Sequence, residues 1–177
     1  MKHLPVFVDF ETTGCDFFTD YPIEVGLIFC NEKLSTLDTL NTMIYFEEDE
    51  RRPLDLRKGE RLEAAKVHKI SQEEYERYAK TPKAVCQEIE RRVVALECEH
   101  PPVLVSDNPV FDYYFMQKLF HIAKRKFPFY YHALGLDSMW ALCPVQRGKS
   151  PHRAFEDAQI TLQCFKETFP HTVWAAK

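Results

Sequence analysis

The sequence lacks the features that mark a highly basic polyanion binder, a zinc-stabilised domain or a membrane protein. Its net charge is −4, so no general excess of Lys and Arg would attract a polyanion. Six scattered cysteines form no Cys-x-x-Cys pair, and Cys98-Glu99-His100 has no partner ligands, which favours isolated thiols over a zinc site. No apolar run approaches the length of a membrane span, and no signal peptide is expected ahead of the first strand. These absences predict a cytoplasmic protein without membrane contact.

Nothing in the chain suggests several domains. Repeats, low-complexity tracts and linkers are absent, and 177 residues with 45% hydrophobic content are enough for one well-packed core. We therefore expect a single domain over residues 1–177.

Hydrophobic patterning predicts a group of strands and then alternating helices and strands. Strands are expected over 6–14 (ending in a glycine turn), 23–30, 41–46, 103–105 and 127–136, the last at a sheet edge. Helices are expected over 62–67, 72–79, 82–96, 108–123, 137–142 and 150–169, and 47–61 is expected to be a surface excursion. Short turns between the first three strands indicate antiparallel pairing, so this order predicts an α/β domain with a mixed sheet.

The first expected strand carries two carboxylates two residues apart. Side chains alternate along a strand, so Asp9 and Glu11 point to one face, and Val8 and Phe10 point to the other. Two like charges on an apolar strand are unfavourable unless a cation lies between them, and oxygen-rich sites suit Mg²⁺ and Mn²⁺. Taken alone, the pattern is equally compatible with an edge pair or a salt-bridged pair.

A further acidic residue follows the strand expected at 103–105. Asn108 and Pro109 suit the cap and first position of a helix, and Asp112 lies on the inward stripe of that helix with Phe115. Open α/β sheets place their sites just beyond the carboxyl ends of strands, which makes Asp112 a candidate site residue. Its alternative role is to stabilise the helix N-terminus electrostatically.

The last acidic candidate lies near the start of the final expected helix. Asp157 falls among the small, packed residues Ala154 and Ala158, where an acidic side chain needs a partner. His152 precedes it by five residues, about 140° around a helix, and follows the segment 147–150. An imidazole that titrates near neutrality suits a general base at this place, although a solvated surface histidine has the same pattern.

Together, these motifs resemble the DEDDh 3′–5′ exonucleases, also called DnaQ-like, of the ribonuclease H-like superfamily. The three family motifs are matched by Val8–Gly14, by Asn108–Asp112 and by His152-x-Ala154-x-x-Asp157-Ala158. Weaker similarities are found at Pro22–Gly26 and at Val67-His68-x-Ile70. The resemblance covers nearly the whole chain. It implies a ribonuclease H-like fold, with a mixed five-stranded sheet of three antiparallel strands and then parallel strands, flanked by helices.

The resemblance also implies a two-metal hydrolase that acts on the 3′ ends of single-stranded DNA or RNA. Two Mg²⁺ or Mn²⁺ ions would be held by four carboxylates, those of Asp9, Glu11, Asp112 and Asp157. His152 would take a proton from the attacking water. The product would be a nucleoside 5′-monophosphate.

Five residues are implied as substrate contacts: Thr12, Thr13, Phe17, Asn108 and Lys69. Thr12 and Thr13 would offer backbone contacts to the terminal sugar. Either Phe17 or Phe18 would stack on a terminal base, or the side chain instead plugs the loop 15–22. Lys69 replaces a glycine common in the family and is either a phosphate contact or solvated.

Other features leave the biological role open. Asp107 stands where many relatives have histidine, and the extra carboxylate would either recruit an ion or repel phosphate. The motifs do not decide between DNA and RNA. The main alternative is a proofreading or nucleic-acid-binding subunit that acts through a homodimer, a polymerase or another processing partner; a phosphoesterase for small esters is a third reading.

Overall fold

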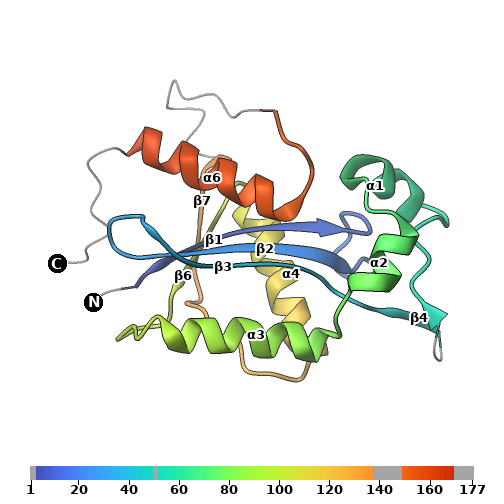
Figure 1. Ribbon diagram of the computed structural model, residues 1–177, viewed down its shortest axis with the longest axis horizontal. Coiled ribbons are helices and arrows are strands. Elements are labelled where there is room, and N and C mark those ends of the chain that lie inside the picture. The colour runs from blue at the N-terminus through green and yellow to red at the C-terminus, as the bar shows by residue number, and fades with distance from the viewer. Residues whose placement is uncertain (1–2, 50–51, 138–148, 170–177) are drawn as a thin grey trace.

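A five-stranded sheet in the order β3-β2-β1-β6-β7 forms the centre of the computed structural model, which describes residues 3–49, 52–137 and 149–169 (Figure 1). The strands of this sheet are β1 (Pro5–Thr12), β2 (Pro22–Cys30), β3 (Thr36–Met43), β6 (Val103–Ser106) and β7 (Ala133–Gly135). The helices are α1 (Arg61–His68), α2 (Gln72–Tyr78), α3 (Pro82–Ala95), α4 (Pro109–Ile122) and α6 (Ala154–Thr168). β1, β2 and β3 pair antiparallel, whereas β1, β6 and β7 pair parallel. The predicted mixed α/β sheet is confirmed.

The sheet is covered on both faces, and the alternation of β1 decides which side chain meets which helix. Val6, Val8 and Phe10 join the larger core, to which α3 and α4 contribute. Phe7 joins the smaller core beneath α6. Figure 1 shows α6 and α3 on opposite sides of the sheet. Asp9 and Glu11 lie two and four residues after Phe7, so their side chains point to the same face of the sheet, toward α6.

Helix α4 begins where β6 ends, as its sequence predicts. The Asn108 side chain accepts a hydrogen bond from the Phe111 backbone N–H (3.3 Å), and Pro109 occupies the first helical position. The parallel pairing of β1 with β6 extends only to Phe7 and Val105. The last residues of β1 therefore have no β6 residue paired with them, and their backbone groups can bond to the start of α4.

The prediction of the third strand over 41–46 was wrong in its bounds. β3 starts at Thr36 because the turn before it is tight: the Asn31 side chain accepts hydrogen bonds from the backbone N–H groups of Lys33 (2.9 Å) and Ser35 (3.0 Å). β3 lies at the sheet edge and is exposed over most of its first half, so it lacks the apolar alternation used to find strands.

Two other predicted segments differ from the structure. The edge strand expected over 127–136 is reduced to the three residues of β7. The excursion 47–61 contains a small ribbon, β4 (Glu47–Asp49) paired with β5 (Arg52–Pro53), and it buries Leu54 and Leu56. Residues 138–142 of a further expected helix lie outside the described part of the chain.

Helix α6 starts three residues after Pro151, rather than at the Ser150–Pro151 cap that the sequence suggested. His152 has a left-handed backbone (φ 57°), which a continuous right-handed helix does not allow. The Ser150 hydroxyl accepts a hydrogen bond from the His152 N–H (3.1 Å) and so closes a local turn.

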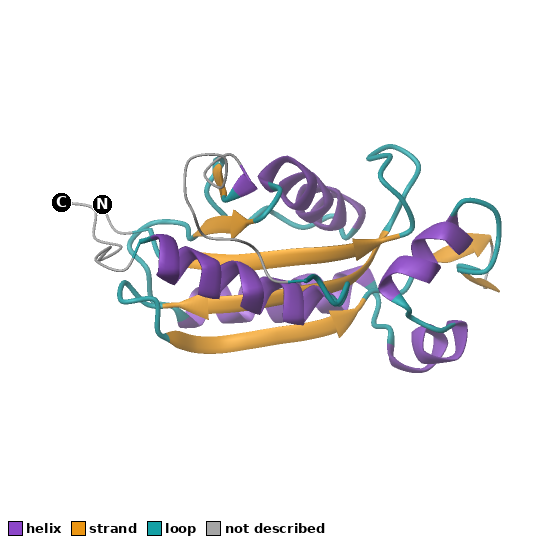
Figure 2. Ribbon diagram, turned by 90° about the horizontal axis from the view of Figure 1, so that it is seen from above, coloured by secondary structure: helices purple, strands orange, loops and turns teal. Residues whose placement is uncertain are grey.

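Helices α1 and α2, with the β4–β5 ribbon, lie together at one end of the sheet (Figure 2). This is the end toward which β1 runs (Figure 1). Ser71 caps α2 by accepting a hydrogen bond from the Glu74 N–H (3.1 Å). Over the described segments, every helix is too short or too polar to cross a bilayer.

Candidate active site

Side chains from β1, α4 and α6 line a cavity of about 300 Å³ at the carboxyl end of β1. We call this cavity the acidic cleft. It is lined by five carboxylates and one imidazole, those of Asp9, Glu11, Asp107, Asp112, Asp157 and His152. The cleft therefore brings together parts of the chain that lie about 150 residues apart in sequence.

Three of these carboxylates converge closely. Asp9, Glu11 and Asp157 each offer an oxygen, and these oxygens lie within 4.8 Å of one another. Asp157 is 2% exposed, and its Oδ2 accepts a hydrogen bond from the Arg153 backbone N–H (3.1 Å). That bond orients the carboxylate at the first turn of α6.

Asp112 reaches the same cleft from α4. Its Oδ1 accepts a hydrogen bond from the Phe10 backbone N–H (3.1 Å), on the part of β1 that β6 no longer pairs. Asp112 is 3% exposed. It lines the cleft beside the close group of three carboxylates without belonging to that group.

The electrostatics of the cleft oppose full ionisation. Burial is the main cause that raises the pKa of Glu11 to about 8, and the carboxylates of Asp157, Glu24 and Asp112 contribute to this rise, while Arg153 opposes it. A divalent cation would reverse this effect by favouring the ionised carboxylate. Three converging carboxylate oxygens suit a hard cation such as Mg²⁺ or Mn²⁺, so the donor set fits the implied metal.

His152 is exposed at the rim of the cleft, on the turn before α6. Its Nδ1 lies 3.3 Å from the Ser150 hydroxyl oxygen. The ring is thus contacted on one nitrogen, which leaves Nε2 as the other proton-exchanging atom. The left-handed backbone at His152 places this residue outside the helix that carries Asp157.

The start of α6 is held by a residue from β2 that sequence reasoning did not assign a role. Glu24 is 1% exposed, and its Oε2 accepts a hydrogen bond from the Ala154 N–H (3.1 Å). The Arg153 guanidinium donates to both oxygens of Glu24 and to Glu74, with closest distances of 2.8 Å and 3.1 Å. Glu24 therefore replaces the missing side-chain cap of α6. The sequence did contain a signal for this role, because Glu24 is a carboxylate on an otherwise apolar strand.

Gly26 explains how α6 comes so close to β2. A Cβ atom at this position would lie 2.4 Å from backbone atoms of Ala154 and Phe155. Any larger residue would push the first turn of α6, and with it Asp157, away from β1.

Of the five residues implied as substrate contacts, only Asn108 lines the acidic cleft. The side-chain oxygen of Asn108 is already used to cap α4. The Thr12 hydroxyl donates to the Gly14 carbonyl (2.6 Å), and the Thr13 hydroxyl donates to Asp20 (2.8 Å). Both threonine side chains thus stabilise the loop after β1.

Phe17 and Lys69 lie outside the lining of the cleft. The Phe17 ring packs 6.0 Å from the ring of Phe111 and 5.3 Å from that of Phe115. Lys69 is exposed at the end of α1 with a left-handed backbone (φ 60°), the conformation that glycine adopts most easily. Cys15 and Phe111 line the cleft without having been predicted to do so.

Comparisons with known proteins agree with this arrangement. A family model described as an exonuclease of the RNase T type matches residues 6–165. The nuclease domain of 3′hExo, a DEDDh family member solved with rAMP, has 14% identity and a TM-score of 0.73, with coverage of 99% of this chain and 96% of that one.

Two exonuclease I structures are also similar. The E. coli enzyme in complex with a dT13 oligonucleotide has 16% identity and a TM-score of 0.69, with coverage of 96% of this chain and 42% of that chain. The Methylocaldum szegediense enzyme has 13% identity and a TM-score of 0.72, with coverage of 97% and 42%. The chain thus spans less than half the length of these enzymes. The comparison with curated proteins found no match.

The structural likeness, at these identities, shows a shared ribonuclease H-like fold. The family model covers most of the chain, including all three motifs on which the resemblance rested. The predicted family is therefore confirmed: the chain belongs to the RNase T family of exonucleases, the DEDDh or DnaQ-like 3′–5′ exonucleases.

Proposed function

We propose that residues 1–177 form one exonuclease domain that removes nucleoside 5′-monophosphates from the 3′ ends of single-stranded DNA or RNA. The observation that carries this proposal is the convergence of Asp9, Glu11 and Asp157 to within 4.8 Å. Asp112 and His152 line the same cleft. The combination suits phosphodiester hydrolysis, because that reaction needs charge neutralisation and a proton acceptor at one place.

The four carboxylates would hold two divalent ions, Mg²⁺ or Mn²⁺. We assign Asp9 to both ions, Glu11 and Asp157 to one of them, and Asp112 to the other. Bound there, the ions would polarise the scissile phosphate and make the attacking water more acidic. The hydrogen bonds to Asp112 from Phe10 and to Asp157 from Arg153 orient these two ligands before any ion binds.

His152 would accept the proton of the attacking water at Nε2. With Nδ1 protonated and donating to the Ser150 hydroxyl oxygen, Nε2 keeps its lone pair for this role. His152 is exposed, and the cleft of about 300 Å³ that it lines with the carboxylates would admit water and the scissile phosphate. The Ser150 contact would help to hold the ring in place.

Substrate contacts would come from the loop after β1 and the start of α4. The backbones of Thr12 and Thr13 directly follow Glu11 and would contact the terminal sugar, and Asn108 would contact the same nucleotide from the other wall. Phe17 and Lys69 lie outside the cleft lining, so their contacts with a base and with a phosphate require a strand that extends beyond the cleft.

A subunit acting mainly through a polymerase or a second copy would need an apolar surface distant from the active site. A large aromatic hollow does exist, but Phe17 of this hollow contacts Phe111 of the acidic cleft. This adjacency favours a role in substrate binding over a separate docking role.

A 5′-labelled single-stranded DNA and its RNA counterpart, incubated with Mg²⁺ or Mn²⁺, test the proposal. We expect a ladder that shortens from the 3′ end and disappears with EDTA. Asp9→Asn should abolish it, whereas Glu156→Gln, at an exposed position beside Asp157, should not. No shortening of either strand with either metal would contradict the proposed function. Thermal unfolding with and without Mn²⁺ measures metal binding independently of activity, and Asp9→Asn should reduce the stabilisation.

A further inference from the structure

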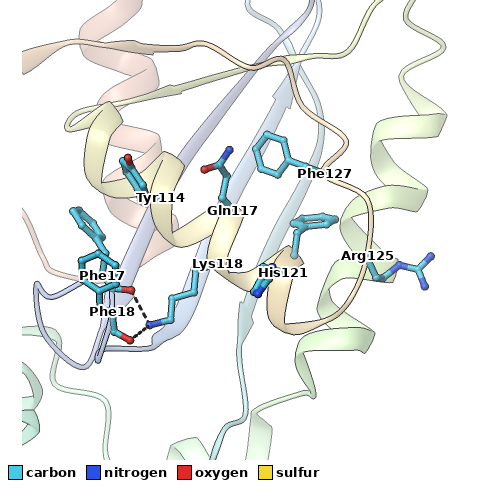
Figure 3. Close-up of a pocket in the computed structure, with 9 residues that line it drawn as sticks. Phe17, Phe18, Tyr114, Gln117, Lys118, His121, Arg125 and Phe127 are labelled. Atoms are coloured by element: carbon cyan, nitrogen blue, oxygen red, sulfur yellow. Dashed lines mark hydrogen bonds between the residues drawn. The ribbon is translucent and has the colours of Figure 1, made fainter.

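A second hollow, of about 800 Å³, lies along the outer side of α4 (Figure 3). We call it the aromatic groove, because its lining includes five aromatic rings, those of Phe17, Phe18, Tyr114, Phe120 and Phe127. Figure 3 shows Phe17 and Phe18 on one side, Phe127 on the other and Gln117 between them. From Tyr114 to His121 the groove follows α4 for about 10 Å.

The aromatic groove starts where the acidic cleft ends. Phe111 lines the cleft, Phe17 lines the groove, and their ring centroids lie 6.0 Å apart. Phe17 also stacks on Tyr114, with 5.0 Å between centroids and 25° between ring planes. A chain that leaves the cleft over Phe111 therefore meets aromatic side chains next.

Two cationic side chains of the groove are already engaged by protein groups. Lys118 donates hydrogen bonds to the carbonyl oxygens of Phe17 (2.9 Å) and Phe18 (3.2 Å) and to that of Asp20. Arg125 donates to both oxygens of Glu90. The groove is thus poorly suited to hold phosphates by charge and better suited to flat, weakly polar groups.

The loop displays Phe18 in a preorganised way. The Phe18 side chain is 95% exposed, while its backbone N–H donates to Asp16 (2.8 Å) and its carbonyl accepts from Lys118. Tyr114 is 52% exposed on the adjoining wall. Two accessible rings on a fixed backbone provide stacking surfaces without the entropic penalty of ordering a mobile loop.

We propose that the aromatic groove binds nucleobases of the substrate strand that lie 5′ to the nucleotides held in the acidic cleft. This inference rests on the proposed exonuclease function and extends it to a specific site. Bases stack on aromatic side chains irrespective of sequence, so the groove would favour longer single strands without sequence preference. The affinity that it contributes would come from stacking and would be nearly independent of salt.

Substrate length is the variable that tests this site. Phe18→Ala and Tyr114→Ala are compared with Val94→Ala, which removes an exposed apolar side chain from α3. Each enzyme is assayed on dT10, on dT3 and on the p-nitrophenyl ester of thymidine 5′-monophosphate. We expect each groove variant to raise KM for dT10 by about 5- to 100-fold. The effect on dT3 and on the ester should be several times smaller, and Val94→Ala should match the wild type throughout.

A base-specific control uses dT10 with abasic residues 5′ to its last three nucleotides. The wild type should bind this strand as weakly as Tyr114→Ala binds dT10, and the variant should lose little more. Equal KM values for wild type and groove variants on dT10 would overturn the groove site and leave the hollow as a protein-docking surface. A smaller salt dependence in the variants would also overturn it, because that result would indicate phosphate contacts.

Failure of the groove site is distinguishable from failure of the exonuclease proposal. Cleavage of dT10 with unchanged KM in the variants rejects only the groove. If no substrate is cleaved, fluorescence anisotropy of labelled dT10 still measures binding. A groove-dependent affinity there supports the nucleobase site, and no difference between variants and wild type rejects it.

Discussion

The acidic cleft and the aromatic groove meet at Phe111 and Phe17, yet the charged side chains that line them differ in sign and in pairing. In the cleft, three carboxylates converge, while the nearby Arg153 guanidinium is bonded to Glu24 and Glu74. In the groove, Lys118 and Arg125 are bonded to carbonyls and to Glu90. Within the described residues, the cleft thus gathers negative charge that a bound cation would balance, whereas the two cations of the groove are already paired. Metal, pH and salt should therefore act on the cleft and hardly on the groove.

The largest effect is expected when the cleft loses one carboxylate. Asp157→Asn removes a proposed metal ligand without changing the size of the side chain, so kcat should fall on the order of 10³-fold. The matched control is Glu156→Gln on the exposed side of the same turn, which should keep wild-type kcat. Initial rates on dT10 at saturating Mn²⁺ measure both. A kcat within tenfold of wild type would remove Asp157 from the metal site.

The second effect is a pH-dependent instability of the metal-free protein. The pKa of Glu11 is about 8 in the folded chain and 4.5 as the ordinary value, so between these pH values the folded state holds more protons than the unfolded state. The free energy of unfolding should therefore fall as pH rises from about 4.5 to 8, by about 4 kcal/mol from this group. Adding Mg²⁺ or Mn²⁺ should restore it at high pH.

Urea unfolding in EDTA at pH 5.5, 7 and 8.5 measures this dependence. Glu11→Gln carries no titratable group at that position, so the advantage of wild type over the variant should shrink as pH rises. His68 provides an opposite contribution that is common to both proteins: burial lowers its pKa to about 4, so its share of stability is lost as pH falls below about 6.5. A wild-type to Glu11→Gln difference that is constant with pH would contradict the shifted pKa.

The sequence predicted the parts of the cleft better than the connections between them. Asp9, Glu11 and Asp112 follow from local periodicity, because a strand alternates its faces and a helix repeats its stripe within a few residues. The Glu24 bonds to Arg153 and Ala154 join positions about 130 residues apart, and no local pattern reports such a contact. The start of α6 was misplaced for the same reason, since its cap comes from β2.

The aromatic groove was even less accessible to sequence reasoning. Its walls come from the loop after β1, from the exposed side of α4 and from the segment after α4, which meet only in the folded chain. Phe17 and Phe18 were identified as stacking candidates, but their neighbours were not. The bounds of β3 were missed because an exposed edge strand needs no apolar alternation.

The third effect concerns Glu24 of β2, which bonds the start of α6 to the sheet. Glu24→Gln keeps the size of the side chain, but it removes the negative charge that pairs with Arg153 and leaves only one oxygen to accept from Arg153 and from the Ala154 N–H. The free energy of unfolding should fall by about 2 kcal/mol, since Arg153 keeps Glu74 as a partner. kcat should fall about 10- to 100-fold, because Asp157 and His152 both depend on the start of α6. Glu73→Gln, at an exposed position on α2, is the control, and equal kcat in both variants would contradict a positioning role.

The smallest effect is expected from the Lys118 contacts that hold the groove loop. Lys118→Met removes the hydrogen bonds to three carbonyl oxygens, so unfolding should become about 1 kcal/mol easier and Phe18 should no longer be held in place. KM for dT10 should rise severalfold, with little change in its salt dependence, because Lys118 contacts carbonyls and not phosphate. The control Lys83→Met removes an exposed charge from α3. If Lys118→Met lowers the salt dependence of dT10 binding and Lys83→Met does not, Lys118 binds phosphate, and the groove would then share the electrostatic character of the cleft.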